Sequence, residues 1–142
     1  MTVRGRLIGG APFFRAWVRS DGFQGALLLL ADTGAARTTI LDFDAKLLGV
    51  PYGDLPAAPR PMAGIGGVVR SFVARDVEVR IGFPGPVLVL RQDLYVTRHD
   101  IQGLAPAEML RIMILPSIMG RDIIDRFRFV YEHATGTVLL ER

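Results

Sequence analysis

The stretch "ALLLLADTGAARTTIL", from Ala26 to Leu41, decides how this sequence is interpreted. It begins with an apolar run of the kind that forms a buried strand. The run leads directly into Asp32-Thr33-Gly34, and burying a carboxylate is costly or shifts its pKa. Either a partner compensates the charge of Asp32, or the triplet is an exposed turn, for which Asp, Thr and Gly are also suitable residues.

The composition is that of a globular protein rich in turns. Of the 142 residues 50% are hydrophobic, and 16 are Gly and 9 are Pro. A chain of this length buries a substantial core without disulfides or metals. We therefore expect one domain spanning residues 1–142.

Several classes of site are not expected. The chain has no Cys and only His99 and His133, which we place on the surface, so neither thiol chemistry nor a Cys/His zinc site is expected. The acidic residues form no cluster that suits a metal, and no cofactor is expected. The net charge is +3 with scattered basic residues, which does not indicate nucleic-acid binding.

The sequence suggests no membrane partner. The N-terminus lacks the apolar core of a signal peptide, and the longest aliphatic run, Ala26 to Ala31, is too short to span a bilayer. We expect a cytoplasmic protein.

Most of the chain has the patterns of strands. Phe14, Ala16 and Val18 alternate with polar or larger residues, and the turn "SDGFQG" would join this segment to the apolar run in a hairpin. Residues 74–82 also alternate, and two further strands flank the turn "HATG". Many short strands with Gly and Pro turns predict an all-β fold, either a small closed barrel or a sandwich.

The remaining segments are less regular. Residues 43–50 predict a short helical turn at best, and the insertion at residues 99–113 is given one helical turn at most. The glycines of "MAGIGGVVRSFV", residues 62–73, favour a mobile hairpin with a Gly-rich tip, and an ordinary hairpin turn is the alternative. "ILPSIMGRDIIDRF", residues 114–127, predicts a strand, then Gly120, then a short helix with Ile123, Ile124 and Phe127 facing the core.

These motifs, in this order, resemble the retroviral-type aspartic proteases (retropepsins) and their bacterial and cellular relatives. The residues that carry the resemblance are Ala31–Ala35, Gly64–Gly67 and Ile118–Asp122, and the likeness covers roughly residues 7–141. It implies a small closed barrel with one short C-terminal helix and a Gly-rich flap hairpin. It also implies an aspartic endopeptidase that works as a homodimer on peptide substrates.

The chemistry requires a dimer independently of the resemblance. Aspartic-protease catalysis uses two carboxylates that share one proton. This chain has one Asp-Thr-Gly, and Asp122 follows an Arg and opens a helix. The second carboxylate would therefore be Asp32 of another subunit, related by two-fold symmetry.

The resemblance assigns roles to residues of these three motifs and to Ala36 and Arg37, which follow the first. Asp32, Thr33 and Gly34 would be catalytic, with Thr33 interlocking across the dimer axis and backbone N–H groups near Gly34 satisfying the carboxylate. The substrate-binding residues would be Ala35, Ala36, Arg37, Ile65, Gly66, Gly67 and Ile118. Structural support would come from Gly120, Arg121 and Asp122.

One departure from the family pattern concerns the position after Asp-Thr-Gly-Ala. Retroviral members usually carry an acidic residue there, whereas this chain has Ala36 followed by Arg37. Arg121 would then pair with Asp42, with Asp44 or with the other subunit, and we expect Arg37 to favour acidic or polar groups in the substrate.

Three further expectations follow. Asp122 would cap the short helix and pair with Arg126 four residues later. The resemblance implies that Thr2–Leu7 and Thr137–Glu141 interleave with their copies in a dimer, as in retroviral members, or that only the C-terminal strands do so, as in some cellular relatives. The alternatives to an active protease are a non-proteolytic dimerisation or peptide-binding module of the same fold, and an unrelated β-domain with a chance triplet.

Overall fold

The computed structural model describes residues 1–59 and 69–142, and strands dominate this part of the chain. The all-β prediction is confirmed. The strands are β1 (Thr2–Arg4), β2 (Arg6–Ile8), β3 (Ala11–Ser20), β4 (Phe23–Ala31), β5 (Thr39–Ile40), β6 (Val69–Ile81), β7 (Leu88–His99), β8 (Ser117–Met119), β9 (Arg128–Glu132) and β10 (Thr137–Glu141).

The helices are short and lie outside the sheets. They are α1 (Asp42–Leu48), the 3-10 turn η1 (Tyr52–Asp54), α2 (Pro106–Met113) and α3 (Arg121–Ile124). α1 and α2 are longer than the single turns expected from the sequence, whereas α3 agrees with the predicted C-terminal helix. No helix among the described residues has the length and apolar character needed to cross a membrane.

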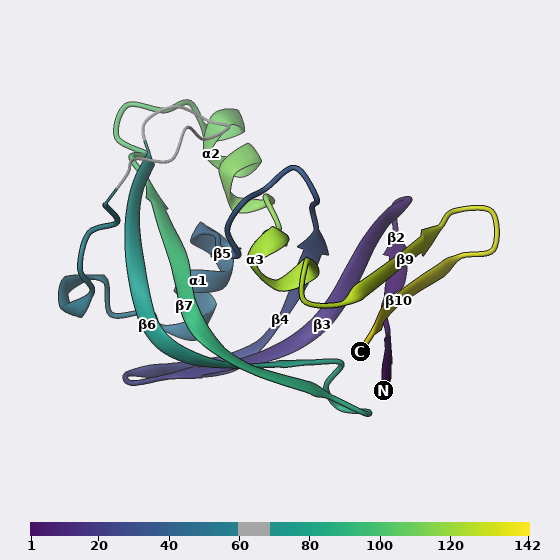
Figure 1. Cartoon of the computed structure of the whole chain (residues 1–142). Coiled ribbons are helices and arrows are strands. Elements are labelled where there is room, and N and C mark those ends of the chain that lie inside the picture. The colour runs from purple at the N-terminus through teal and green to yellow at the C-terminus, as the bar shows by residue number, and fades with distance from the viewer. Residues whose placement is uncertain (60–68) are drawn as a thin grey trace.

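Six strands close into a barrel. Their order is β3-β4-β8-β5-β7-β6, and pairing of β3 with β6 completes the ring, with β2 attached to the outer edge of β3. In Figure 1 the long β6 and β7 ribbon curves around the core opposite α3. The barrel interior is filled by aliphatic side chains and Phe14, as expected for a barrel of this size.

The predicted hairpins form as the alternation indicated. β3 and β4 pair antiparallel, with Ser20 opposite Phe23 across the Asp-Gly turn. Phe14, Ala16 and Val18 all point inward and are at most 1% exposed. Because successive side chains of a strand point to opposite faces, this alternation alone decides which face of β3 is buried.

The chain ends form a separate three-stranded sheet in the order β1-β10-β9. In Figure 1 the β9–β10 hairpin projects away from the barrel, with the N- and C-termini at its base. β1 pairs with β10 of the same chain, from Thr2 opposite Glu141 to Arg4 opposite Leu139. The open edges of this sheet are therefore β1 and β9, since β10 has a neighbour on each side.

β8 brings the second motif, around Gly120, next to the Asp-Thr-Gly motif. It pairs parallel with β4 and antiparallel with β5, so it lies between the two strands that flank Asp32-Thr33-Gly34. Immediately after β8, the backbone of Gly120 touches that of Arg37. A Cβ at Gly120 would lie 2.6 Å from the Arg37 carbonyl carbon and 2.8 Å from its nitrogen and oxygen. Only glycine allows this close approach.

Replacing Gly120 tests this contact. We expect Gly120→Ala to lower the free energy of unfolding by about 1–3 kcal/mol, because the added methyl group must displace backbone atoms. Urea denaturation followed by circular dichroism measures the change. The control is Gly53→Ala, because a Cβ there would meet nothing within 4 Å. Equal stability of the two variants would contradict the close packing.

Candidate active site

Asp32 lies directly after β4, where the chain leaves the barrel wall. Its backbone N–H donates to the carbonyl of Met119 on β8 over 3.0 Å, which continues the pairing of the two strands. Its side chain is half-buried, and Oδ1 accepts a 2.9 Å hydrogen bond from the N–H of Gly34. The Asp32 carboxylate is thus fixed at a strand end and partly withdrawn from water.

The turn around Asp32 packs Gly34 tightly against the carboxylate. A Cβ at this position would lie 3.1 Å from Asp32 Oδ1, which is closer than an ordinary contact. The N–H of Ala35 donates to the carbonyl of Asp32 over 3.2 Å, which closes the turn. Thr33 and Gly34 are both exposed, so the turn presents its backbone on the surface beside the carboxylate.

Asp122 holds the loop from the opposite side and does not cap α3. Both its oxygens accept from the N–H of Thr38, at 2.9 and 3.0 Å, and Oδ1 accepts from the Thr38 hydroxyl at 2.6 Å. Gln92 Nε2 adds a bond of 3.0 Å to Oδ2. The expected cap is wrong, because Gly120 occupies the N-cap position and no side chain bonds there. The expected pair with Arg126 is absent from the ion pairs of the described residues.

Arg121 also contacts the loop, by donating hydrogen bonds to the loop's backbone carbonyls. Its guanidinium donates to the carbonyl of Thr33 over 2.9 Å, and its N–H donates to the carbonyl of Ala35 over 2.8 Å. The expected partners are engaged elsewhere. Asp44 accepts from the hydroxyl of Ser117 at 2.6 Å, and Asp42 bonds to β7. Among the described residues the Arg121 guanidinium therefore has no carboxylate partner, and the backbone carbonyl of Thr33 takes that place.

A mostly apolar cleft opens next to Asp32. Its volume is about 480 Å³, which is within the size range of ligand sites. Its lining residues are Leu30, Asp32, Ala35, Ala36, Arg37, Leu41, Val69, Tyr95, Thr97, His99, Leu115, Pro116 and Ile118.

The cleft brings together residues that the sequence assigned to one site. Asp32, Ala35, Ala36, Arg37 and Ile118 all line it, although 81 positions separate Arg37 from Ile118. Thr33 and Gly34 lie beside it on the surface. The predicted flap residues, Ile65, Gly66 and Gly67, lie outside the described residues, as does Gly64. Gly120, Arg121 and Asp122 support the loop from behind.

Sequence reasoning missed the contribution of β7 to the cleft. Tyr95, Thr97 and His99 alternate along this strand and line the same cavity. The Arg37 guanidinium lies 6.0 Å from the centre of the Tyr95 ring, within the range of a cation–π contact. The i, i+2 spacing of these residues was visible in the sequence, but nothing local indicated which face of β7 meets Asp32.

His99 is buried, contrary to its expected place on the surface. It is 6% exposed, and its Nδ1 lies 2.6 Å from Asp42 Oδ1. Its backbone N–H donates to Asp42 Oδ2 over 2.7 Å. His133 is exposed, as expected. These bonds tie the start of α1 to the end of β7, a link between residues 57 positions apart that no local pattern predicts.

The hydroxyl of Thr38 is the centre of the support behind the loop, since it also accepts from the N–H of Gly120 over 3.0 Å. We expect Thr38→Val to lower the free energy of unfolding by about 1–3 kcal/mol, because a buried N–H and a carboxylate lose a partner. Thr38→Ser keeps the hydroxyl and is the matched control. Urea denaturation compares them, and a valine variant as stable as the serine variant would exclude this role.

The comparisons with known proteins agree with the geometry. Similar solved structures include a retropepsin-like aspartic protease from Rickettsia conorii, with a TM-score of 0.58 and 17% identity over 99% of this chain and 88% of that one. Another is the EIAV protease in complex with an inhibitor, with a TM-score of 0.51 and 21% identity over 82% and 86% of the two chains.

Sequence comparison adds little. No family model matches the chain. A curated relative, protein MoxR of Paracoccus denitrificans, is 26% identical over 144 aligned residues, and this chain spans 40% of its length. The fold is shared with the solved proteases over most of the chain, and it places Asp32-Thr33-Gly34 at the end of β4 beside a cleft. The chain thus has the fold of the retropepsin-like aspartic proteases.

Proposed function

We propose that this protein is a homodimeric aspartic endopeptidase in which Asp32 of each subunit forms the catalytic pair. The observation that carries the proposal is the position of the Asp32 carboxylate and its hydrogen bonding. It is half-buried at the wall of an apolar cleft, and one of its oxygens accepts from Gly34. Its other oxygen has no hydrogen bond within residues 1–59 and 69–142, which leaves it available to a water molecule and a second carboxylate.

The proposed mechanism follows from two carboxylates that share a proton. The ionised Asp32 takes a proton from a bound water, whose oxygen attacks the carbonyl carbon of the substrate peptide. The protonated Asp32 donates its proton to the carbonyl oxygen, which gives a tetrahedral intermediate. Transfer of a proton to the amide nitrogen then allows the C–N bond to break and releases an acid and an amine.

The dimer is part of the proposal, because one chain supplies one carboxylate. Thr33 and Gly34 are exposed beside Asp32 and would meet their copies at the two-fold axis. In the terminal sheet the open edges β1 and β9 would be the places for strand pairing between subunits, since β10 already has two neighbours. An obligate interface of this kind buries roughly 2,000 Å² or more. The proposal treats residues 1–142 as one domain.

The cleft is suited to an extended peptide. Residues of β4, β6, β7 and β8 line it, and an extended peptide bound along strands forms main-chain hydrogen bonds. The apolar side chains of Leu30, Leu115 and Ile118 would then contact apolar side chains of the substrate.

Removal of the Asp32 charge tests the proposal. We expect Asp32→Asn to abolish cleavage of unfolded casein between pH 4 and 8, because asparagine cannot act as the base. Wild-type activity should be highest at mildly acidic pH, where the pair retains one proton. Its specific activity should rise with protein concentration as dimers form.

The control for this experiment is Asp54→Asn, at an exposed residue outside the cleft. It should cleave casein as wild type does. If neither wild type nor this control cleaves casein or a random peptide library at any concentration, while wild type and Asp32→Asn bind the same peptides, the protein is a peptide-binding module. The proposed catalysis would then be wrong.

Arg37 generates a prediction about specificity. It lines the cleft, is exposed, and has no ion pair within the described residues, so its charge is available to a substrate. We expect Arg37→Ala to reduce cleavage of library peptides with an acidic residue near the cut about tenfold relative to neutral peptides. Arg75→Ala, at an exposed position of β6 outside the cleft, is the control. An unchanged profile would rule out this role of Arg37.

A further inference from the structure

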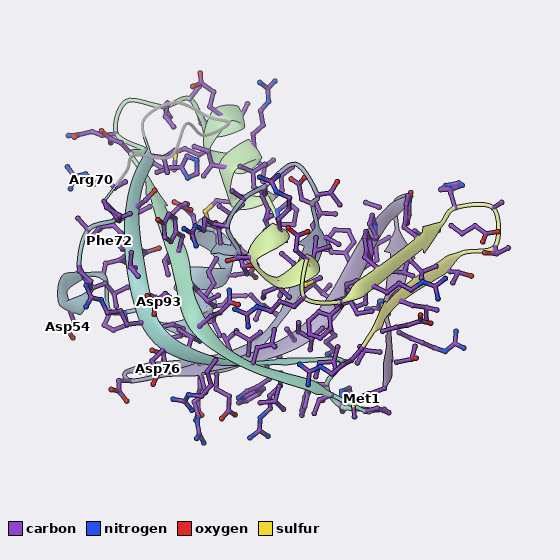
Figure 2. The ribbon with its side chains drawn as sticks, viewed as in Figure 1. Met1, Asp54, Arg70, Phe72, Asp76 and Asp93 are labelled. Carbon is purple, nitrogen blue, oxygen red and sulfur yellow. The ribbon has the colours of Figure 1, made fainter. Side chains whose placement is uncertain are left out.

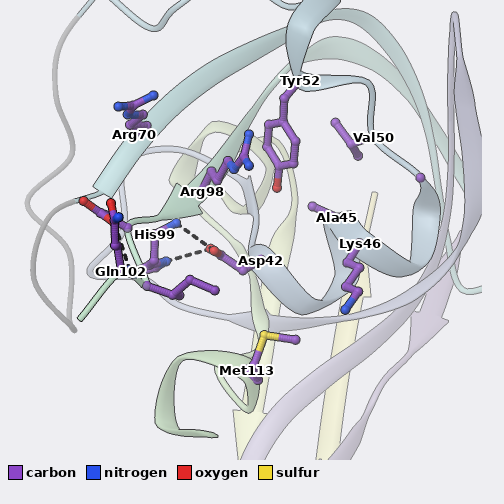
Figure 3. A pocket seen from close by; sticks show the side chains of 13 residues that line it. Asp42, Ala45, Lys46, Val50, Tyr52, Arg70, Arg98, His99, Gln102 and Met113 are labelled. Carbon is purple, nitrogen blue, oxygen red and sulfur yellow. Dashed lines mark hydrogen bonds and ion pairs between the residues drawn. The ribbon is translucent and has the colours of Figure 1, made fainter. Parts of the chain in front are cut away.

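A second cavity lies beside the candidate cleft and has a different character. Its volume is about 910 Å³, and Figure 3 shows its lining from α1, η1 and the adjacent ends of β6 and β7. Three cationic side chains, Lys46, Arg70 and Arg98, line it. His99 lines both cavities, so the end of the β6–β7 ribbon separates them.

The two arginines of this cavity lie on neighbouring strands. Arg70 on β6 lies directly opposite Arg98 on β7 in the antiparallel register. Like charges at such positions repel each other. Neither arginine, nor Lys46, forms an ion pair with any of the described residues. The lining thus holds three cationic side chains against the carboxylates of Asp42 and Asp100, and this excess of positive charge favours an anionic partner.

Arg98 is held in place by an aromatic ring. Its guanidinium lies 5.4 Å from the centre of the Tyr52 ring, and Figure 3 shows the two side chains next to each other. The Tyr52 hydroxyl donates to the carbonyl of Thr97 over 2.8 Å, which fixes the ring. Burial and the nearby Asp42 raise the pKa of Tyr52 to about 12, with Arg98 acting in the opposite direction. The ring therefore stays neutral and provides a rigid surface for Arg98.

The acidic groups of this cavity are already bonded to other residues. Asp42 accepts from Thr97 and from the backbone of His99, and it lies against the His99 ring. Asp100 accepts from the N–H of Gln102 over 3.0 Å.

Other carboxylates on the β6–β7 ribbon are remote. Figure 2 shows Arg70 near one end of β6, whereas Asp76 and Asp93 lie well along the ribbon from it. Asp76 is also engaged, because it forms an ion pair of 2.9 Å with Arg91. The positive charges of the second cavity are therefore not neutralised from this side.

We propose that the second cavity binds a multiply charged anion, either a phosphate ester or a polycarboxylate. Guanidinium groups match the geometry of phosphate and carboxylate oxygens, and Lys46 adds a point charge. The cavity volume suits a small organic molecule, and Ala45, Val50 and Met113 provide apolar contact for its body. This inference does not depend on proteolytic activity.

Direct binding measurements test the site. Isothermal titration calorimetry with inorganic pyrophosphate and, separately, citrate distinguishes the two chemistries by which binds more tightly. We expect Arg70→Gln and Arg98→Gln each to weaken binding of the preferred anion about tenfold or more, because each removes a charge-assisted contact. Arg75→Gln, on β6 but outside this cavity, is the control and should bind as wild type does.

Thermal stability gives a second readout that a structural role would not produce. Without anion, Arg70→Gln should melt no lower than wild type, because the substitution relieves repulsion. With the preferred anion, the melting temperature of wild type should rise and that of Arg70→Gln should rise less. The proposal is overturned if neither anion binds at millimolar concentration, or if Arg75→Gln weakens binding as much as the other two variants.

Discussion

The contact between the backbones of Gly120 and Arg37 is the constraint on which the candidate site depends. It places the start of α3 against the loop after β4, where a side chain on Gly120 would overlap backbone atoms. Around this contact the loop is bonded at its beginning, middle and end, from Asp32 through Ala35 to Thr38. Since β8 pairs with strands on both sides of the loop, the barrel wall fixes the position of the carboxylate.

This arrangement separates the charges that support the loop from the charges that face the cleft. Asp122 and Arg121 form hydrogen bonds with backbone groups of the loop, so their charged groups hold the loop in place. Asp32 and Arg37 face the cleft with few partners in this chain. Both carboxylates are half-buried, but both oxygens of Asp122 accept hydrogen bonds, whereas one oxygen of Asp32 has no hydrogen bond among the described residues and is available for chemistry.

Sequence patterns predicted the elements that depend on local alternation or on local turns. The β3–β4 hairpin and the inward face of β6 follow from a period of two, and α3 follows Gly120 as expected. The lengths of α1 and α2 were underestimated, because short helices in a β protein are stabilised by packing more than by propensity. The predicted partners of Asp122 and the predicted exposure of His99 were wrong, because each depends on a residue more than fifty positions away.

The sequence alone determined that this chain is rich in strands, with one Asp-Thr-Gly and a second motif before its last helix, because side-chain periodicity and glycine positions are local properties. Its patterns left a barrel and a sandwich open, and only the resemblance implied the barrel. The sequence also determined that one chain holds only one such aspartate, since this is a matter of counting. The tertiary structure decided which side chains line the cleft with Asp32 and that Arg70 lies opposite Arg98. It also decided that the Asp122 carboxylate accepts hydrogen bonds from Thr38 and does not cap a helix. These contacts depend on strand register and on barrel closure, which bring distant residues together and which no short stretch of sequence encodes.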